Sequence, residues 1–229
     1  QYEPAELQAS PDPAPPAARL TFVPREGAVQ SEIRVGHLGI ARKADDFHAV
    51  RVMDMVLGGQ FTSRLNMNLR EAKGYTYGVH SSFDARRGRG PFDVGTAVEA
   101  AVTAEAVREI IAELHAIRDA RPVTEEELAV AKPAITLGFP RAFETSGQVA
   151  RAALRLALFD LPDDEYTTFV PRVEAVDAAA ATAAARRRLD PDALAVVVVG
   201  PPEVRPSLGA LGLGEPVDAT PDGVDATRP

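Results

Sequence analysis

Cysteine is absent from this sequence of 229 residues, and its absence excludes several kinds of chemistry at once. Disulfide bridges, thiolate nucleophiles, iron–sulfur clusters and cysteine-ligated zinc all need that side chain. Long apolar runs are missing too. The longest one near the C-terminal end, Leu194–Val199, is far shorter than the roughly 20 residues that a membrane-spanning helix needs. We therefore predict no transmembrane segment and interpret this run as a buried strand.

Cations are also scarce relative to anions. The chain has 25 Lys and Arg residues against 33 Asp and Glu residues, so its formal net charge is −8 at pH 7. Nucleic-acid binding modules need clustered cations in excess, because their affinity depends on neutralising backbone phosphates. We therefore predict that nucleic acid is not a partner.

Histidine, the scarcest metal-binding side chain present, occurs four times, and no two histidines share the close helical spacing of a zinc motif. Neither H-E-x-x-H nor its reverse H-x-x-E-H occurs. A metal site assembled from distant positions, such as His48 with Asp45, remains an alternative to simple solvated histidines. A serine nucleophile elbow is absent, and Gly88-Arg89-Gly90, half of a dinucleotide fingerprint, lies between two predicted strands. The sequence therefore predicts no metal site in this chain.

Prolines divide the chain into three parts. They are frequent in residues 1–24 and 201–229 and sparse between, so we predict a Pro/Ala-rich linker over 1–24 and a folded domain over 25–200. The remaining range, 201–229, is predicted to be a partly packed or disordered tail. A chain of this length buries roughly 70–75% of its unfolded surface, which allows a sizeable core.

Residue periodicity within the domain predicts an α+β fold with a mainly antiparallel sheet. A capping box, Thr124 with Glu127, marks the start of one helix. The predicted strands are 31–40, 75–83, 91–99 and 194–200, the middle two forming a hairpin. The predicted helices begin at residues 45 or 46, 61, 103, 124, 145, 165 and 177.

The stretch from residue 57 to 83 carries the most informative motifs. They are Leu57-Gly58-Gly59, Ser63-Arg64-Leu65, Leu69-Arg70-Glu71 and Gly74-Tyr75-Thr76-Tyr77-Gly78, in that order. In these motifs the sequence resembles the second, metal-free domain of the insulinase/pitrilysin family of zinc peptidases, which includes the mitochondrial processing peptidases. The resemblance extends over about residues 20–200. It implies a two-lobed metallopeptidase-like domain built as a duplicated α/β unit, with six strands and helices on one face.

The resemblance also implies site residues and a partner. In the family, an arginine and a tyrosine seven residues later reach substrate bound at the zinc of a facing H-x-x-E-H domain, and Arg70 and Tyr77 occupy those positions. Gly59 is predicted to contact substrate with them. Zinc is therefore expected in the partner domain, in the same full-length chain or a separate subunit, with no cofactor in this chain. The isolated chain is predicted to be inactive.

The chemistry of the two side chains agrees with those roles. A phenol suits the stabilisation of a tetrahedral oxyanion, and a guanidinium can position a substrate carbonyl through two hydrogen bonds. The alternative is a purely structural role, in which Arg70 complements a helix dipole and Tyr77 is an ordinary aromatic residue of a strand. Strand alternation would place Tyr75 on the same face as Tyr77, which leaves Tyr75 as an alternative phenol.

Two functions follow from the sequence. The first is the complementing half of a zinc endopeptidase or oligopeptidase, with the peptide substrate added in extended form to a sheet edge. The alternative is a non-catalytic peptide-binding or assembly subunit of the same fold. A nucleotide-binding protein is a third interpretation that depends only on the failed glycine match. The compartment, cytoplasmic or exported, stays open, although bacterial relatives of this type are often exported.

Overall fold

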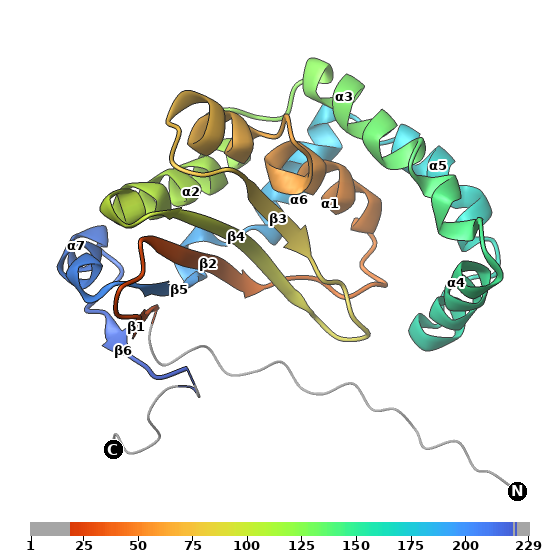
Figure 1. Cartoon of the computed structure of the whole chain (residues 1–229). Coiled ribbons are helices and arrows are strands. Elements are labelled where there is room, and N and C mark those ends of the chain that lie inside the picture. Colours follow the sequence, from red (N-terminus) through yellow and green to blue (C-terminus); the bar gives the residue numbers. More distant parts are fainter. Residues whose placement is uncertain (1–18, 222, 224–229) are drawn as a thin grey trace, which may run out of the picture.

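A single six-stranded sheet forms the base of the molecule (Figure 1). The computed structural model describes residues 19–221 and 223. The strand order is β3-β4-β2-β5-β1-β6, with antiparallel pairing from β3 through β5 and parallel pairing of β1 with β5 and β6. The strands are β1 (Leu20–Pro24), β2 (Gln30–Leu38), β3 (Val79–Phe83), β4 (Pro91–Glu99), β5 (Ala195–Gly200) and β6 (Val217–Asp218).

The central strands owe their place to alternating and β-branched residues. In β2, Ile33 and Val35 are fully buried, while the alternating residues Glu32 and Arg34 are exposed. Ile33 lies opposite Val198 of β5, so the apolar residues of neighbouring strands line the same face. One face of the sheet is therefore apolar along its whole centre.

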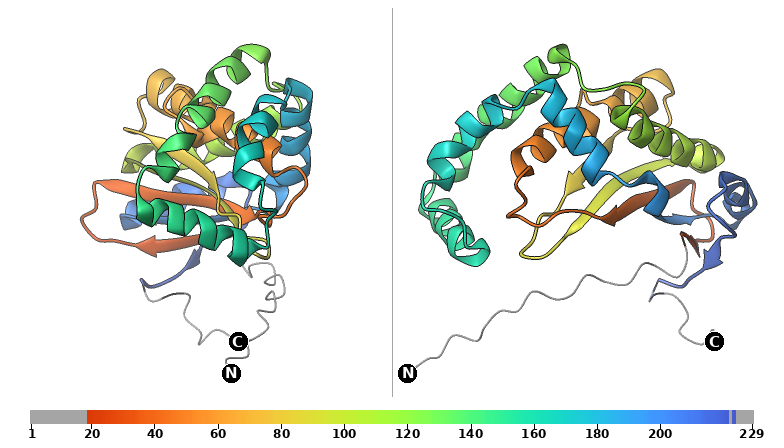
Figure 2. Two further views of the ribbon diagram at one scale, coloured as in Figure 1. Left: turned by 90° about the vertical axis from the view of Figure 1, so that its right-hand side faces the viewer. Right: turned by 180° about the vertical axis from the view of Figure 1, so that it is seen from behind.

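Three helices cover that apolar face, as Figures 1 and 2 show. They are α1 (Phe47–Asp54), α2 (Thr103–Arg118) and α6 (Ala178–Arg188). Helix α2 buries Ile110, Leu114 and Ile117 at helical spacing, and the alanines of α6 let it pack closely. The predicted α+β class, with a mainly antiparallel sheet and helices on one face, is confirmed.

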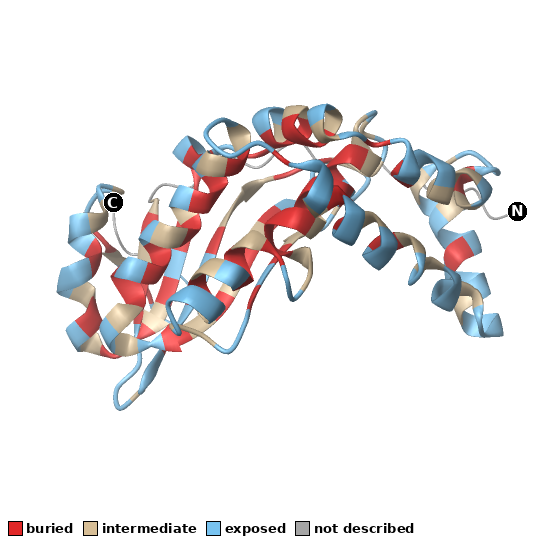
Figure 3. Cartoon of the chain, turned by 90° about the horizontal axis from the view of Figure 1, so that it is seen from above, coloured by how far each residue is buried: buried red, intermediate tan, exposed pale blue. Residues whose placement is uncertain are grey.

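A second group of helices curves away from the sheet, and we call residues 125–174 the arm (Figure 2). It contains α3 (Glu125–Thr136), α4 (Ser146–Phe159) and α5 (Glu165–Glu174). Capping boxes begin α3, at Thr124 and Glu127 as predicted, and α4. Ala152 is the one buried residue of α4, so this helix of the arm is largely exposed (Figure 3).

The sheet extends beyond the predicted domain limits at both ends. Strand β1 lies inside the range 1–24 that was predicted to be linker, because its apolar residues pair with β5. The Pro/Ala-rich part of that prediction lies outside the described residues. In the range 201–229, α7 (Arg205–Leu208) buries Leu208, and β6 pairs with β1. Short 3-10 turns follow several elements, at Ala100–Val102, Phe139–Phe143, Pro191–Ala193, Pro202–Val204 and Gly209–Leu211.

No helix within residues 19–221 has both the length and the apolar character that crossing a membrane requires.

Candidate functional site

The segment from residue 57 to 79 crosses from the end of α1 to the start of β3. Helix α1 continues into a π-helical turn, η1 (Met55–Gly59), which ends at the glycine pair Gly58-Gly59. A second helix begins at Arg64, three residues later than predicted, and is π-helical over η2 (Asn66–Ala72). Gly74 follows with φ +66°, and the carbonyls of Leu69 and Arg70 accept hydrogen bonds from the N–H groups of Tyr75 and Gly74. Two π-helical turns so close together are unusual, and such turns often occur at functional sites.

The prediction of a strand from residue 75 is wrong, because β3 begins at Val79. Residues 75–78 form a loop that Thr76 holds. Its Oγ accepts from the Gly78 N–H at 3.0 Å and lies 2.9 Å from Thr96 Oγ of β4. The alternation argument that put Tyr75 and Tyr77 on one face therefore fails.

Asn66 joins η2 to the first residue of β3. Its Nδ2 donates to the Val79 carbonyl at 2.8 Å, and its Oδ1 accepts from the Val79 N–H at 3.1 Å. The same Nδ2 also lies 3.1 Å from the Gln60 carbonyl and from Ser63 Oγ. Asn66 is buried, so this side chain fixes the C-terminal end of the loop that carries Tyr77.

The π-helical turn η1 packs directly on β3 at Gly58. A Cβ on Gly58 would lie 2.5 Å from Ser81 Oγ, so only glycine allows this approach. Ser81 in turn donates to Asp54 Oδ1 at 2.6 Å. Burial raises the pKa of Asp54 to about 7, against the smaller opposing effect of the Ser81 hydrogen bond.

Arg70 lies on η2 with its guanidinium partly free. The Cζ atom sits 3.9 Å above the ring centroid of Phe61, and Nη1 is 3.0 Å from Glu71 Oε1 at an angle that makes no hydrogen bond. The arginine side chain is 30% exposed. Stacking on Phe61 fixes the plane of the guanidinium, whose Nη1 atom is buried and makes no hydrogen bond.

Tyr77 is 93% exposed, and its hydroxyl has no hydrogen-bond partner within the described residues. Phe61, 62% exposed, and Met67 are further exposed apolar side chains of the same segment. Tyr75, in contrast, packs against the core with Lys73 Nζ 5.8 Å from its ring centroid. The structure thus separates the two tyrosines and leaves Tyr77 as the phenol that faces outward.

Gly59 ends η1 and is half-buried. A Cβ there would lie 3.1 Å from the Asp54 carbonyl oxygen, so a larger residue would press on the backbone of α1. Within residues 19–221, no hydrogen bond or ring contact joins Arg70 to Tyr77; both lie in the segment 57–79, with the Arg70 side chain 30% exposed and Tyr77 93% exposed.

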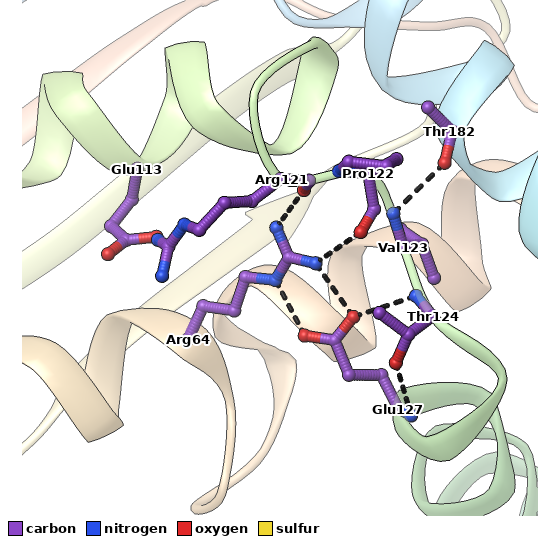
Figure 4. A network of polar contacts seen from close by, with 8 residues as sticks. All are labelled: Arg64, Glu113, Arg121, Pro122, Val123, Thr124, Glu127 and Thr182. Carbon is purple, nitrogen blue, oxygen red and sulfur yellow. Dashed lines mark hydrogen bonds and ion pairs between the residues drawn. The ribbon is translucent and has the colours of Figure 1, made fainter.

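Arg64, from the motif Ser63-Arg64-Leu65, makes structural contacts that the sequence alone did not predict (Figure 4). Its Nε and Nη2 bind the two carboxylate oxygens of Glu127 at 2.6 and 2.7 Å, and its guanidinium also donates to the carbonyls of Arg121 and Pro122. Glu127 completes the capping box by accepting from the Thr124 N–H at 3.0 Å. Arg64 therefore connects the start of the second helix to the start of the arm.

A second polar group supports the other side of η2. Asn68 donates to Glu109 and Glu113 of α2 at 3.0 and 2.8 Å, and Lys73 pairs with Glu109 at 3.0 Å. Arg121 pairs with Glu113. These contacts fix η2 against α2, which holds Arg70 in place on a supported helix.

The described residues contain no group of three or more His, Asp or Glu side chains arranged to hold a metal ion. His48, considered with Asp45, lies between the rings of Phe47 and Phe169, with centroids 5.4 Å away in each case. Burial lowers the pKa of His48, and the positions of its neighbours suit an aromatic contact rather than a ligand.

The arginine run late in the chain is occupied by internal partners. Arg187 and Arg188 both bind the carboxylate of Asp46, and Arg186 pairs with Asp119. The helix α1 was predicted to begin at residue 45 or 46, and Asp46 is its N-cap residue, but the Asp46 carboxylate makes no cap hydrogen bond and binds arginines of α6 instead. Asp46 and these arginines are about 140 residues apart in the sequence, so no local pattern predicts their pairing.

A family model described as the peptidase M16 inactive domain matches residues 3–135. Among solved structures, the peptidase M16 inactive domain from Pseudomonas fluorescens superposes with a TM-score of 0.77 and 24% identity, over 85% of this chain and 46% of that one. A conserved protein from Enterococcus faecalis superposes with a TM-score of 0.72 and 22% identity, over 82% of this chain and 43% of that one. A protease from Helicobacter pylori superposes with a TM-score of 0.70 and 19% identity, over 85% of this chain and 48% of that one.

The chain therefore spans about half the length of these structures. No curated protein matches it.

Proposed function

The chain belongs to the M16, or insulinase-type, peptidase family, as the domain described as inactive, and from this premise we propose that it is the zinc-free half of a peptidase. In this proposal it supplies Arg70 and Tyr77 to a peptide held between it and a facing zinc domain. The facing domain is either another part of a longer chain or a separate subunit. No metal is needed from this chain, whose described residues offer no suitable donor set.

The observation that carries the proposal is the state of Tyr77. An aromatic side chain that is 93% exposed gains nothing for the stability of this domain, yet its loop is held by Asn66 and Thr76. A rigid loop that presents an unpartnered hydroxyl outward is what pre-organised catalysis requires. The alternative phenol, Tyr75, is half-buried and packs against the core.

The chemistry of the proposed step is simple on this side of the site. Attack of water on a peptide carbonyl places negative charge on the carbonyl oxygen, and the Tyr77 hydroxyl donates a hydrogen bond to it. Arg70, held flat on Phe61, donates to a neighbouring carbonyl of the substrate and sets the register of the peptide. Zinc, supplied by the facing domain, would provide the Lewis acid for the attacking water.

An assay with a quenched fluorescent peptide tests the proposal. This chain, the H-x-x-E-H domain and an equimolar mixture of the two are compared in the presence of zinc. We expect cleavage by the mixture and none by either component. A verified stoichiometric complex that cuts no member of a broad peptide library would contradict the proposal.

One observation favours the second candidate function, a binding or assembly subunit. Phe61, Met67 and Tyr77 are all exposed on one segment, and exposed apolar groups commonly mark protein contacts. In that case the same surface would hold the partner or a peptide without turnover. The mixing assay separates the two functions, because only the first predicts cleavage.

A further inference from the structure

A groove of about 520 Å³ lies between the arm and the body, away from Arg70 and Tyr77. The tip of the hairpin β3–β4 and helix α4 approach each other on that side of the molecule (Figure 1). None of the residues that line the groove belongs to the segment 57–79. Its volume is within the range of pockets that hold small ligands or short peptide segments.

Aromatic rings supply much of the groove wall. Those from the arm are Phe139, Phe143, Phe159, Tyr166 and Phe169, and those from the body are Phe47 and Phe83. Phe139 stacks on Phe169 with centroids 4.4 Å apart, and Phe143 meets Tyr166 edge-on at 5.1 Å. These contacts fix the rings in place, so the apolar wall exists before any ligand binds.

Arginines line both walls. Arg51 lies on α1 of the body, and Arg151 and Arg155 lie one turn apart on α4. These three form no hydrogen bond and no ion pair within the described residues. Arg42, the fourth, is already paired with Glu165 at 2.5 Å.

Carboxylates do not balance these cations. Among the described lining residues Asp84 is the one acid, and it is paired with Arg86 at 2.6 Å. The chain as a whole has a net charge of −8, so three unpaired guanidinium groups at one groove run against its overall balance. Three exposed guanidinium groups beside apolar rings in one groove favour an anionic ligand.

We infer that this groove binds an acidic peptide segment that carries large apolar side chains. Guanidinium groups on both walls favour a ligand with more than one carboxylate, and the rings between them favour apolar side chains along the same ligand. An extended peptide with alternating acidic and apolar residues presents both kinds of group at once. Such a site is independent of zinc and of turnover, so it goes beyond the peptidase proposal.

Fluorescence anisotropy with this chain alone tests the inference. The probe is a fluorescein-labelled hexapeptide in which glutamate alternates with phenylalanine, and its neutral partner has glutamine for glutamate. The variant Arg151→Gln/Arg155→Gln removes two groove cations. Its matched control, Arg108→Gln/Arg141→Gln, removes two exposed cations that do not line the groove.

We expect the acidic probe to bind at least about tenfold more tightly than the neutral one, since two charge-assisted contacts are lost in the latter. The groove variant should bind the acidic probe about tenfold more weakly than the parent, and the control variant should bind it less than about twofold more weakly. Binding of the acidic probe should also weaken from 50 to 300 mM salt.

Three results would overturn the inference. They are equal binding of the acidic and neutral probes, equal effects of the groove and control variants, and competition by free phenylbutyrate as strong as that of the unlabelled acidic hexapeptide. The last would show a site for a small organic acid. Circular dichroism of each variant confirms that a loss of binding does not come from unfolding.

Discussion

The Asn66 side chain makes the same pair of hydrogen bonds with Val79 that a neighbouring strand would make. Its amide group donates to the Val79 carbonyl at 2.8 Å and accepts from the Val79 N–H at 3.1 Å. A side chain of η2 thus replaces one rung of a β-ladder at the start of β3. This pairing ends the strand there and frees residues 75–78 to form the loop that presents Tyr77.

Replacing Asn66 by alanine should destabilise the domain by about 2–3 kcal/mol, because both buried backbone groups of Val79 lose their partner. Chemical denaturation measures the loss, and hydrogen exchange should show faster exchange of the Val79 amide. Asn68→Ala is the matched control, since Asn68 bonds only to side chains that keep other partners. Equal stability of the two variants would refute the role given to Asn66.

Replacing Glu127 by glutamine should cost about 2 kcal/mol, because the bidentate bond to Arg64 loses its charge while the arginine stays in place. Burial alone would raise the pKa of Glu127, but hydrogen bonds from Arg64 outweigh it and hold that pKa below its usual value. Thermal unfolding measures the change. For comparison, Glu105→Gln removes an exposed pair with Arg108 and should cost under about 0.5 kcal/mol. A similar loss of stability in Glu127→Gln and Glu105→Gln would argue against the network in Figure 4 as a connection to the arm.

Asp54 should make stability fall as pH rises. Its pKa is about 7 in the folded chain and near 3.8 when exposed, so the folded state binds the proton more tightly between these values. This contribution is fully present below pH 3.8 and is lost as pH rises to 7, on the order of 4 kcal/mol at most.

Asp54→Asn keeps an acceptor for the Ser81 hydroxyl and removes the titration. Its unfolding free energy should exceed that of the parent at pH 8, and the difference should shrink toward pH 4. Asp192→Asn, at an exposed carboxyl, serves as the control. Parallel pH profiles for the parent and Asp54→Asn would show that Asp54 is not the titrating group.

Local patterns in the sequence predicted much of the fold. The alternation in β2, the apolar spacing of α2 and the capping box at Thr124 all act over a few residues, and the structure confirms them. The same kind of signal failed at residue 75. There the strand propensity of two tyrosines lost to the side-chain bonds of Asn66 and Thr76.

Pairings between residues far apart in the chain could not be predicted from local sequence patterns. Arg64 meets Glu127, Asp46 meets Arg188, and β1 pairs with β5 only after the chain has folded. The two-residue strand β6 is too short for a periodicity to predict. Motifs drew attention to Arg70 and Tyr77, but only the structure distinguished the outward Tyr77 from the packed Tyr75.

The catalytic role that we propose for Tyr77 is tested most directly by the turnover number of the assembled peptidase carrying Tyr77→Phe, with Tyr75→Phe as the control. Both variants lose one hydroxyl, and neither ring changes size. Our account predicts that kcat falls by about 10²-fold or more for Tyr77→Phe with little change in KM, because the hydrogen bond forms only in the transition state. It also predicts that Tyr75→Phe stays within about twofold of the parent. Unchanged kcat for Tyr77→Phe in an assembly that cuts peptide would contradict it.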